Sequence, residues 1–304
     1  MLAKLHTLAR ALGGEVCRDQ VLAPALGHSR HDRSLSVRID PRAPGGVLVH
    51  CFGSGDPLAE KDRVRQILGL GESWISRQHE PSATHPAPQE GDDRERTARA
   101  LSHWADAEDP LGTAVEAYLQ GRGLSLPDGA AGEAVRFHPC CPFAGERVPA
   151  MVCLVRDVVT NQPKAIHRTA LTHDGAKATV NGHSRLSLGP VARGAIKLSP
   201  DEDVTLCLGV GEGIESSLSL RSAPEFGPSP VWSLISAGGV AGLPVLSGIE
   251  SLWIAVDHDP AGLKAARACA SRWQASGREA FLITPSAPRA DLNDLVTGAH
   301  HAQR

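Results

Sequence analysis

The first residues of the chain follow a helical and then a strand-like pattern of apolar positions. Leucines recur at helical spacing over residues 2–12, and Gly13 follows them, which predicts a short first helix. Residues 35–39 and 47–49 are short runs rich in Val, Leu and Ile, a composition typical of strands. We therefore expect a small β-rich domain over residues 1–71.

The middle of the chain has a different pattern. Residues 72–99 are rich in Pro, His, Gln, Ser and charge, with few apolar residues to bury, which predicts a linker. A helical pattern follows over residues 99–120, and residues 150–159 and 165–171 are strand-like. This mixture predicts an α+β region over residues 100–200.

Strand-like and helical segments alternate over residues 201–304. Residues 204–210, 231–235, 251–256 and 279–283 predict strands, and residues 262–276 predict a helix between the last two. Alternation of this kind gives a parallel sheet covered by helices. We therefore predict an α/β fold for this C-terminal domain.

Composition and charge exclude some classes of protein. The 304 residues carry 31 Lys and Arg against 34 Asp and Glu, so the chain is not a globally basic nucleic-acid binder. Residues 1–71 hold 10 basic and 7 acidic side chains, whereas residues 201–304 hold 7 and 12. This polarity predicts cation binding in the C-terminal domain.

Apolar runs and cysteines indicate the compartment. No apolar run approaches the roughly 20 residues that a membrane helix needs, so we expect no membrane role. The 7 cysteines are odd in number and irregularly spaced, which is typical of a reducing environment. We therefore expect a cytoplasmic protein.

Acidic residues follow three of the predicted C-terminal strands. Glu212 follows the first, Asp257 and Asp259 follow the third, and Asp291 and Asp294 come after the last. Because the carboxyl ends of parallel strands share one edge, we expect these side chains to meet in one crevice. Clustered carboxylates need a positive group among them, and oxygen ligands suit Mg²⁺ or Mn²⁺. The pattern predicts metal-dependent phosphoryl transfer.

Each acidic residue taken singly also has a structural explanation. Glu212 could be a solvated turn residue, and Asp259 before Pro260 has the pattern of a helix N-cap. Their common position after predicted strands favours the metal site.

The runs GVGEGIESSLSL, LWIAVDHDPAGLKAA and DLNDL resemble the motifs of the Toprim domain, which bacterial-type DNA primases, topoisomerases and some nucleases share. The resemblance implies that Glu212 is the Toprim glutamate and that Asp257 and Asp259 are the metal-binding pair. It implies that Asp291 is the later acid, with Asp294 as a further candidate metal ligand. Glu215 occupies a secondary acidic position, where a charge on the helix surface is an equally good explanation.

The N-terminal region resembles the zinc-binding domain of phage-type and plasmid-type primases, in the runs VLAPALGHSRHDRSLSV and GGVLVHCFGSGD. Ala23 and Gly55 stand where two of that family's cysteines would be, which leaves His28 and Cys51 as vestigial ligands. Two ligands cannot close a tetrahedral site, so we expect no zinc here.

Basic residues outside the Toprim-like region are candidate contacts to nucleic-acid or nucleotide phosphates. Arg30 and Arg33 belong to the first domain, where an ordinary solvated face is the alternative explanation. The middle region, PAMVCLVRDVVTNQPKAIHRTALTHDG, resembles the segment that precedes Toprim in primase-like proteins. That resemblance adds four candidates, His167, Arg168, Lys177 and Lys197.

These expectations together indicate a DNA primase-like protein that makes primers on single-stranded DNA from nucleoside triphosphates. A topoisomerase is disfavoured because the only tyrosine, Tyr118, lies in a predicted helix far from the acidic motifs in sequence. The sequence shows no ATPase phosphate loop, so any replicative helicase would be a separate partner. Two alternatives stay open: a Toprim nuclease, and a non-catalytic DNA-binding accessory protein of replication.

Overall fold

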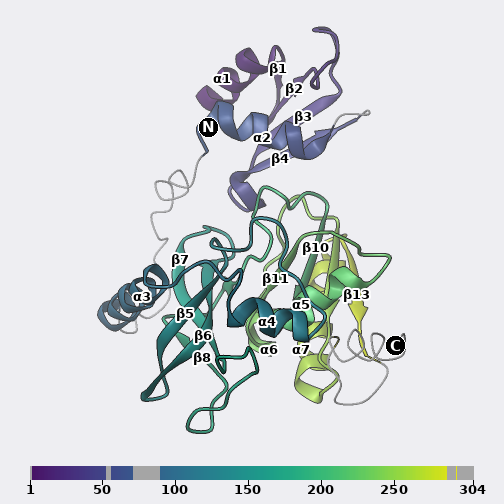
Figure 1. Ribbon diagram of the computed structural model, residues 1–304. Coiled ribbons are helices and arrows are strands. Elements are labelled where there is room, and N and C mark those ends of the chain that lie inside the picture. Colours follow the sequence, from purple (N-terminus) through teal and green to yellow (C-terminus); the bar gives the residue numbers. More distant parts are fainter. Residues whose placement is uncertain (1, 53–55, 71–89, 286–291, 293–304) are drawn as a thin grey trace. The chain divides into compact units, whose positions relative to one another are not determined.

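The computed structural model describes residues 2–52, 56–70, 90–285 and 292 (Figure 1). These residues form two compact units. The first consists of the described residues up to 70 together with Asp201–Leu206 and Leu246–Glu250. The second consists of the described residues of Ala83–Pro200, Cys207–Val245 and Ser251–Arg304.

The first unit is a four-stranded antiparallel sheet with two helices. Its elements are α1 (Leu2–Leu12), β1 (Glu15–Cys17), β2 (Gln20–Ala23), β3 (Leu35–Ile39), the 3-10 turn η1 (Pro44–Gly46), β4 (Val47–Cys51) and α2 (Pro57–Leu68). The strands pair in the order β1-β2-β3-β4. Leu5, Leu8 and Leu12 of α1 are buried in one core with Val21, Val37 and Val64, so the predicted first helix and the β-rich character of this region are confirmed.

A buried lysine ties a later segment of the chain into the first unit. The ammonium of Lys61, on α2, donates hydrogen bonds to the carbonyls of Asp201 at 2.8 Å and Val204 at 2.6 Å. Burial lowers the pKa of Lys61 to about 8. The unit therefore includes residues 201–206, which the sequence pattern had assigned to the C-terminal domain.

The second unit contains an antiparallel sheet with a different core on each face. Its strands are β5 (Val135–Phe143), β6 (Glu146–Asp157), β7 (Pro163–Ala170) and β8 (Arg185–Leu188), with the short β9 (Gly194–Ala195) paired to β6. Val152, Leu154 and Ile166 pack with Ala100 of helix α3 (Glu90–Ala105). Residues that alternate with them, such as Cys153, pack on the other face with helix α4 (Ala114–Gly121).

The helical region before this sheet differs from the prediction. The expected helix over residues 99–120 is two helices, because Pro110 and Gly112 lie between α3 and α4 and Gly112 has φ 72°. Thr113 then caps α4 by accepting a hydrogen bond from the backbone N–H of Val115. Helix α3 begins at Glu90, so the segment expected to be a linker, residues 72–99, includes a helical part.

The rest of the second unit is a four-stranded parallel sheet, as predicted. The strands β10 (Cys207–Gly211), β11 (Val231–Ser233), β12 (Ser251–Ala255) and β13 (Glu279–Ile283) pair in the order β11-β10-β12-β13. All three pairings are parallel. The helical segments between them are α5 (Ile214–Ser219), η3 (Leu220–Ser222), α6 (Ala237–Gly242) and α7 (Pro260–Ala275), with α5 beside α4 in Figure 1. This sheet confirms the α/β fold class.

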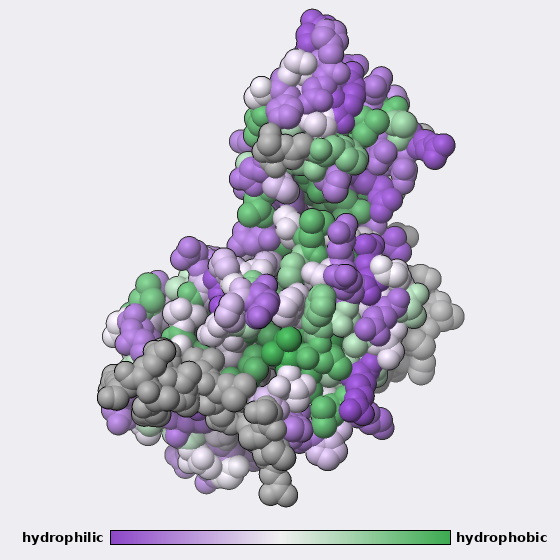
Figure 2. Space-filling model, turned by 90° about the vertical axis from the view of Figure 1, so that its right-hand side faces the viewer, coloured by the Kyte–Doolittle hydropathy of each residue, from purple (hydrophilic) through white to green (hydrophobic). Residues whose placement is uncertain are grey.

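None of the helices among the described residues is long and apolar enough to cross a membrane. In the view of Figure 2 much of the surface is hydrophilic, and hydrophobic residues are visible in several separate places.

Candidate active site

Two of the predicted acidic residues meet at the carboxyl ends of neighbouring parallel strands. Glu212 follows β10 directly, and Asp257 lies just beyond β12. The register pairs Gly211 with Ala255, so the two loops leave the sheet at the same level. Both acids line a cavity of about 80 Å³, here called the carboxylate pocket. Its other lining residues are His167, Arg185, Gly213, Ile214, Glu215, Ser216, Ser233 and Ile235.

Glu212 is held in an environment that disfavours its charge. Burial raises the pKa of its carboxyl group, and the neighbouring charges of Asp257 and Asp259 raise it further. A backbone hydrogen bond from Ala237 opposes these effects without cancelling them. The hydroxyl of Ser233 donates to the Glu212 carbonyl at 3.0 Å and so ties the loop to β11.

Asp257 and Asp259 play different structural roles in the loop after β12. The Asp257 carboxylate accepts a hydrogen bond from the hydroxyl of Ser216 at 3.1 Å. Asp259 is the N-cap of α7 and accepts the backbone N–H of Gly262 at 2.7 Å, with Pro260 opening the helix as predicted. Asp259 does not line the carboxylate pocket, but its charge acts on Glu212.

A divalent cation fits the chemistry of this loop cluster. The donors are carboxylate oxygens, which Mg²⁺ and Mn²⁺ prefer, and the charges of Asp257 and Asp259 add to burial in raising the pKa of Glu212. The oxygens of Glu212, Asp257 and Asp259 are not all within 4.8 Å of one another, so these three residues do not form a closed cage. A cation among them would offset the repulsion between these carboxylates.

The other half of the pocket contains a buried, fully paired carboxylate. Glu215 is 2% exposed, accepts a hydrogen bond from the hydroxyl of Tyr118, and forms an ion pair with Arg185 at 2.6 Å. Burial alone would raise the pKa of Glu215, but Arg185 and Tyr118 lower it to about 2. The three side chains come from α5, β8 and α4, so this group joins the antiparallel sheet to the parallel one. We call Tyr118, Arg185 and Glu215 the seam triad.

His167 lines the pocket as a neutral group. Its Nδ1 and the Ser187 hydroxyl form a hydrogen bond of 3.0 Å. Burial, with the nearby charge of Arg185, lowers the pKa of His167 to about 4. At neutral pH His167 can therefore exchange hydrogen bonds with a ligand but offers no positive charge.

Ile235 adds local backbone strain to the pocket wall. It lies between β11 and α6 and has φ 73°, a left-handed conformation that a β-branched side chain rarely adopts. Such strain is concentrated at functional sites in proteins.

The structure does not place Arg168 and Lys197 at the pocket. Both are buried, and neither lines it. Arg168 donates to the Pro142 carbonyl, and its guanidinium lies 5.8 Å from the centre of the Phe143 ring. Lys197 lies 4.6 Å from the centre of the Trp232 ring. These placements do not favour the predicted phosphate contacts. Lys177 is exposed, and its charge acts on Glu215.

The candidate phosphate-binding and zinc-binding residues of the first unit differ in their surroundings. Arg33 forms an ion pair with Glu15 at 3.1 Å, whereas Arg30 is exposed. His28 lies 2.5 Å from the Asp32 carboxylate, and burial raises the pKa of the partly buried Cys51 thiol. The absence of zinc from this unit stays a prediction. The predicted acids Asp291 and Asp294 lie outside the described residues.

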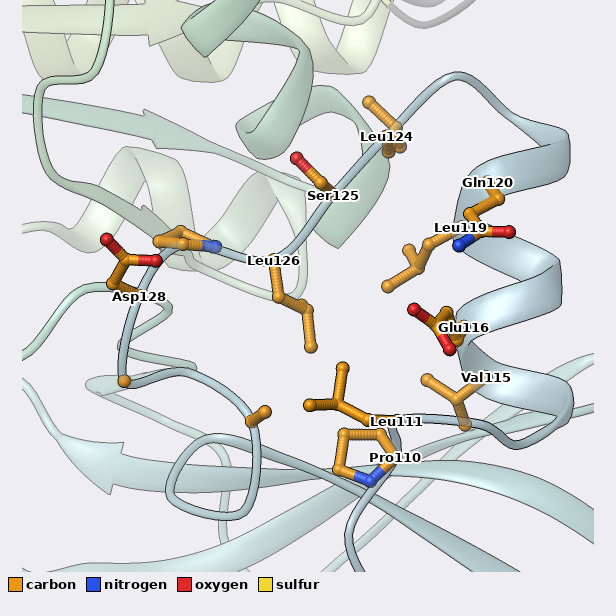
Figure 3. Close-up of a pocket in the computed structure, with 13 residues that line it drawn as sticks. Pro110, Leu111, Val115, Glu116, Leu119, Gln120, Leu124, Ser125, Leu126 and Asp128 are labelled. Carbon is orange, nitrogen blue, oxygen red and sulfur yellow. The ribbon is translucent and has the colours of Figure 1, made fainter.

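A larger cavity elsewhere lacks comparable chemistry. A pocket of about 280 Å³ lies between α4 and residues 124–131, and Leu111, Leu119 and Leu126 point into it (Figure 3). Asp128 points away from the cavity centre in this view. Because the lining is mainly apolar and holds no cluster of catalytic groups, we place the candidate active site in the smaller carboxylate pocket.

Sequence reasoning missed most of the seam triad. The sequence pattern places Tyr118 only in a predicted helix, and it does not single out Arg185 at all. A sequence signal existed only for Glu215, at the secondary acidic position of the Toprim-like motif. Its partners come from positions 97 and 30 residues away, which no local pattern connects.

Comparison with known families assigns each half of the second unit. Residues 207–300 match the family model of the Toprim domain, which confirms the resemblance found in the sequence. Residues 94–198 match a family described as a domain of unknown function, DUF7146. No curated protein matches the chain.

Several solved primase structures are distantly similar. The primase fragment of the bacteriophage T7 primase-helicase protein is 16% identical to this chain and has a TM-score of 0.40. The aligned region covers 62% of this chain and 72% of the T7 fragment. The Aquifex aeolicus primase is 12% identical, with 99% and 81% covered and a TM-score of 0.43. A Pseudomonas aeruginosa primase domain is 15% identical, with 68% and 77% covered and a TM-score of 0.43.

Proposed function

We propose that this chain, whose residues 207–300 form a Toprim domain, is a metal-dependent nucleotidyltransferase that makes primers on single-stranded DNA. The observation that supports the proposal is the division of one pocket into two parts. Glu212 and Asp257 form an acidic part of the pocket, and Arg185, which is ion-paired with Glu215, faces the same space. Nucleotidyl transfer needs both, because a metal ion and a cation must share the charge of a triphosphate.

The acidic part would hold the cation through named residues. Glu212 and Asp257 would bind Mg²⁺ or Mn²⁺, with Asp259 and the sequence-predicted Asp291 and Asp294 as further candidates. When bound, such an ion lowers the pKa of an attacking hydroxyl and neutralises charge on the transferred phosphate. Glu212 would either bind the ion or take up the proton of the attacking 3′ hydroxyl.

The seam side of the pocket would orient the nucleotide. The guanidinium of Arg185 has five N–H donors, and its pairing with Glu215 fixes its direction. Arg185 would bind phosphate oxygens through the remaining donors, with Lys177 adding positive charge nearby. His167, neutral and facing the pocket, would donate or accept one hydrogen bond with the substrate.

The proposal names the partners by their chemistry. The substrates would be single-stranded DNA and nucleoside triphosphates in the cytoplasm, with a separate replicative helicase as a protein partner. Arg30 and Arg33 of the first unit would contact template phosphates.

A labelled-nucleotide assay tests this function. Purified chain is incubated with single-stranded DNA, labelled nucleoside triphosphates and Mg²⁺ or Mn²⁺, and the DNA lengths are measured. Extended products are expected, and shortened DNA would instead identify a metal-dependent nuclease that uses water as the attacking group. Binding without either reaction would identify an accessory protein. Either of these two results would contradict the proposal.

The Asp257→Asn variant tests the assigned residues in the same assay. It removes one charge from the acidic part and should lower activity on the order of 10²- to 10³-fold, the usual cost of removing a preorganised electrostatic group. The matched control is Asp128→Asn, because Asp128 is exposed and does not line the carboxylate pocket. Equal activity in the two variants would contradict the site.

A further inference from the structure

A second group of ionisable side chains lies at the end of α3. His103 belongs to α3, Asp106 follows the end of that helix, and His138 belongs to β5. One ligand atom from each residue lies within 4.8 Å of the other two. Among the residues that the structure describes, this is the one group of three His, Cys, Asp or Glu that meets that distance.

The group lies on the opposite face of the antiparallel sheet from the carboxylate pocket. His138 pairs with Ala150, which packs beneath α3 together with Val152. The alternating residues Met151 and Cys153 pack in the core shared with the parallel sheet. Because successive side chains on a strand point to opposite faces, the two sites are separated by the sheet itself.

The ligand set differs in kind from the acidic site. His103 is partly buried and His138 is buried, and the imidazole ring of each can offer one nitrogen lone pair to a metal ion. Asp106 is exposed and supplies one carboxylate. Two neutral imidazoles and one carboxylate suit Zn²⁺ and related transition metals, whereas Mg²⁺ prefers oxygen ligands alone.

The strand geometry around His138 is irregular. The pairing of β5 with β6 shifts register between His138 and Cys141, a β-bulge of the kind that re-aims side chains beside binding sites. The Nδ1 atom of His138 accepts the backbone N–H of Cys140 at 3.2 Å. A metal bound through Nε2 requires the proton on Nδ1, so binding would open this long hydrogen bond.

We propose that His103, Asp106 and His138 bind one divalent transition-metal ion of the Zn²⁺ class and so clamp the end of α3 to β5. Three protein ligands leave the fourth position to water, which can reach the site because Asp106 is exposed. The site is independent of the Mg²⁺ or Mn²⁺ proposed for the carboxylate pocket, in position and in ligand chemistry.

Metal analysis of the full chain tests this proposal. The protein is dialysed against Zn²⁺, and bound metal is counted per chain. Co²⁺ is then substituted, and its visible absorption reports the ligand geometry. One Zn²⁺ per chain is expected, with affinity at least about tenfold lower in Asp106→Asn and in His103→Gln. Asp106 is exposed, so the first variant tests ligation with little risk to the fold.

Two control variants distinguish this site from other ligands. His173→Gln changes an exposed histidine outside the group, and Cys51→Ser removes a vestigial ligand of the first unit. Both should bind Zn²⁺ as the unmodified chain does. Absence of bound Zn²⁺, equal binding by Asp106→Asn and His103→Gln, or loss of Zn²⁺ only in Cys51→Ser would overturn the proposal. Since no nucleotide is used, failure of the proposed primer synthesis would not affect the result.

Discussion

Each of the two halves of the carboxylate pocket, the acidic half and the half with the seam triad, contains one glutamate. The pKa values of these two glutamates are shifted in opposite directions. Glu212 and Glu215 are three residues apart, and burial pushes the pKa of both upward. Asp257 and Asp259 reinforce that shift at Glu212, whereas Arg185 and Tyr118 reverse it at Glu215. Because burial acts in the same direction on both carboxyl groups, the opposite shifts of their pKa values come from their neighbours. Arg185 supplies the positive charge beside Glu215, and the proposed divalent cation would supply it beside Glu212 and Asp257.

Removal of each glutamate in turn should change the free energy of unfolding by different amounts in the two halves of the pocket. Glu215→Ala leaves the Arg185 guanidinium and Tyr118 hydroxyl without their partner and, because Arg185 is partly exposed, should lower the free energy of unfolding by about 2–3 kcal/mol. Glu212→Ala relieves repulsion from neighbouring acids and should change it by less than about 1 kcal/mol. Urea denaturation of both variants measures the difference. Equal losses would mean that the two halves do not differ as described.

The contributions of Glu215 and Glu212 to the free energy of unfolding should also depend on pH in different ways. The pKa of Glu215 is about 2 in the folded chain against 4.5 for an ordinary glutamate, so between these values the unfolded chain binds more protons. The Glu215 contribution is therefore complete above about pH 4.5 and is lost as the pH falls toward 2. It amounts to at most about 3 kcal/mol.

Glu215→Gln isolates this contribution from that of other carboxylates. The unmodified chain should lose more stability than Glu215→Gln between pH 5 and pH 2 in denaturation experiments, by up to about 3 kcal/mol. Without divalent cations, the contribution of Glu212 to stability should change with pH in the opposite direction. Its pKa is raised in the folded chain, so the folded chain takes up the proton at a higher pH than the unfolded chain does. Parallel curves for the unmodified chain and Glu215→Gln would refute the pairing of Glu215.

The phenol of Tyr118 should have the smallest effect of the seam triad. Tyr118→Phe keeps the buried ring but removes the hydrogen bond to the Glu215 carboxylate, a loss of about 1.5–3 kcal/mol. The Glu215 pKa should also rise because one of its two main stabilising partners is gone. Denaturation in combination with Glu215→Gln gives the coupling between the two residues. Additive losses would show that they do not interact.

The sequence predicts the residues of the acidic half of the pocket better than those of the seam triad. Glu212 and Asp257 each follow a strand, and the parallel topology alone brings strand ends together, so local pattern and topology suffice. The Asp259 cap and Pro260 are likewise read from adjacent residues. The seam triad depends on how two sheets pack, and no short-range pattern encodes a contact between α4, β8 and α5.

The adjacent residues His167 and Arg168 show what a sequence pattern alone does not predict, namely which face of a strand is functional. Both were expected to contact phosphates, yet adjacent residues of a strand point to opposite faces. His167 faces the carboxylate pocket, whereas Arg168 lies on the face that packs against α3. Which face is functional depends on the position of the parallel sheet, and that is known only from the folded structure.

Binding of Mn²⁺ tests most directly the claim that the acidic half, and not the seam, requires a cation. Electron paramagnetic resonance of free Mn²⁺ gives the dissociation constant for the unmodified chain, Asp257→Asn and the exposed control Asp128→Asn. We expect binding at least about tenfold weaker in Asp257→Asn, equivalent to about 1.4 kcal/mol, and unchanged in Asp128→Asn. Equal Mn²⁺ affinity in all three proteins would contradict the metal site.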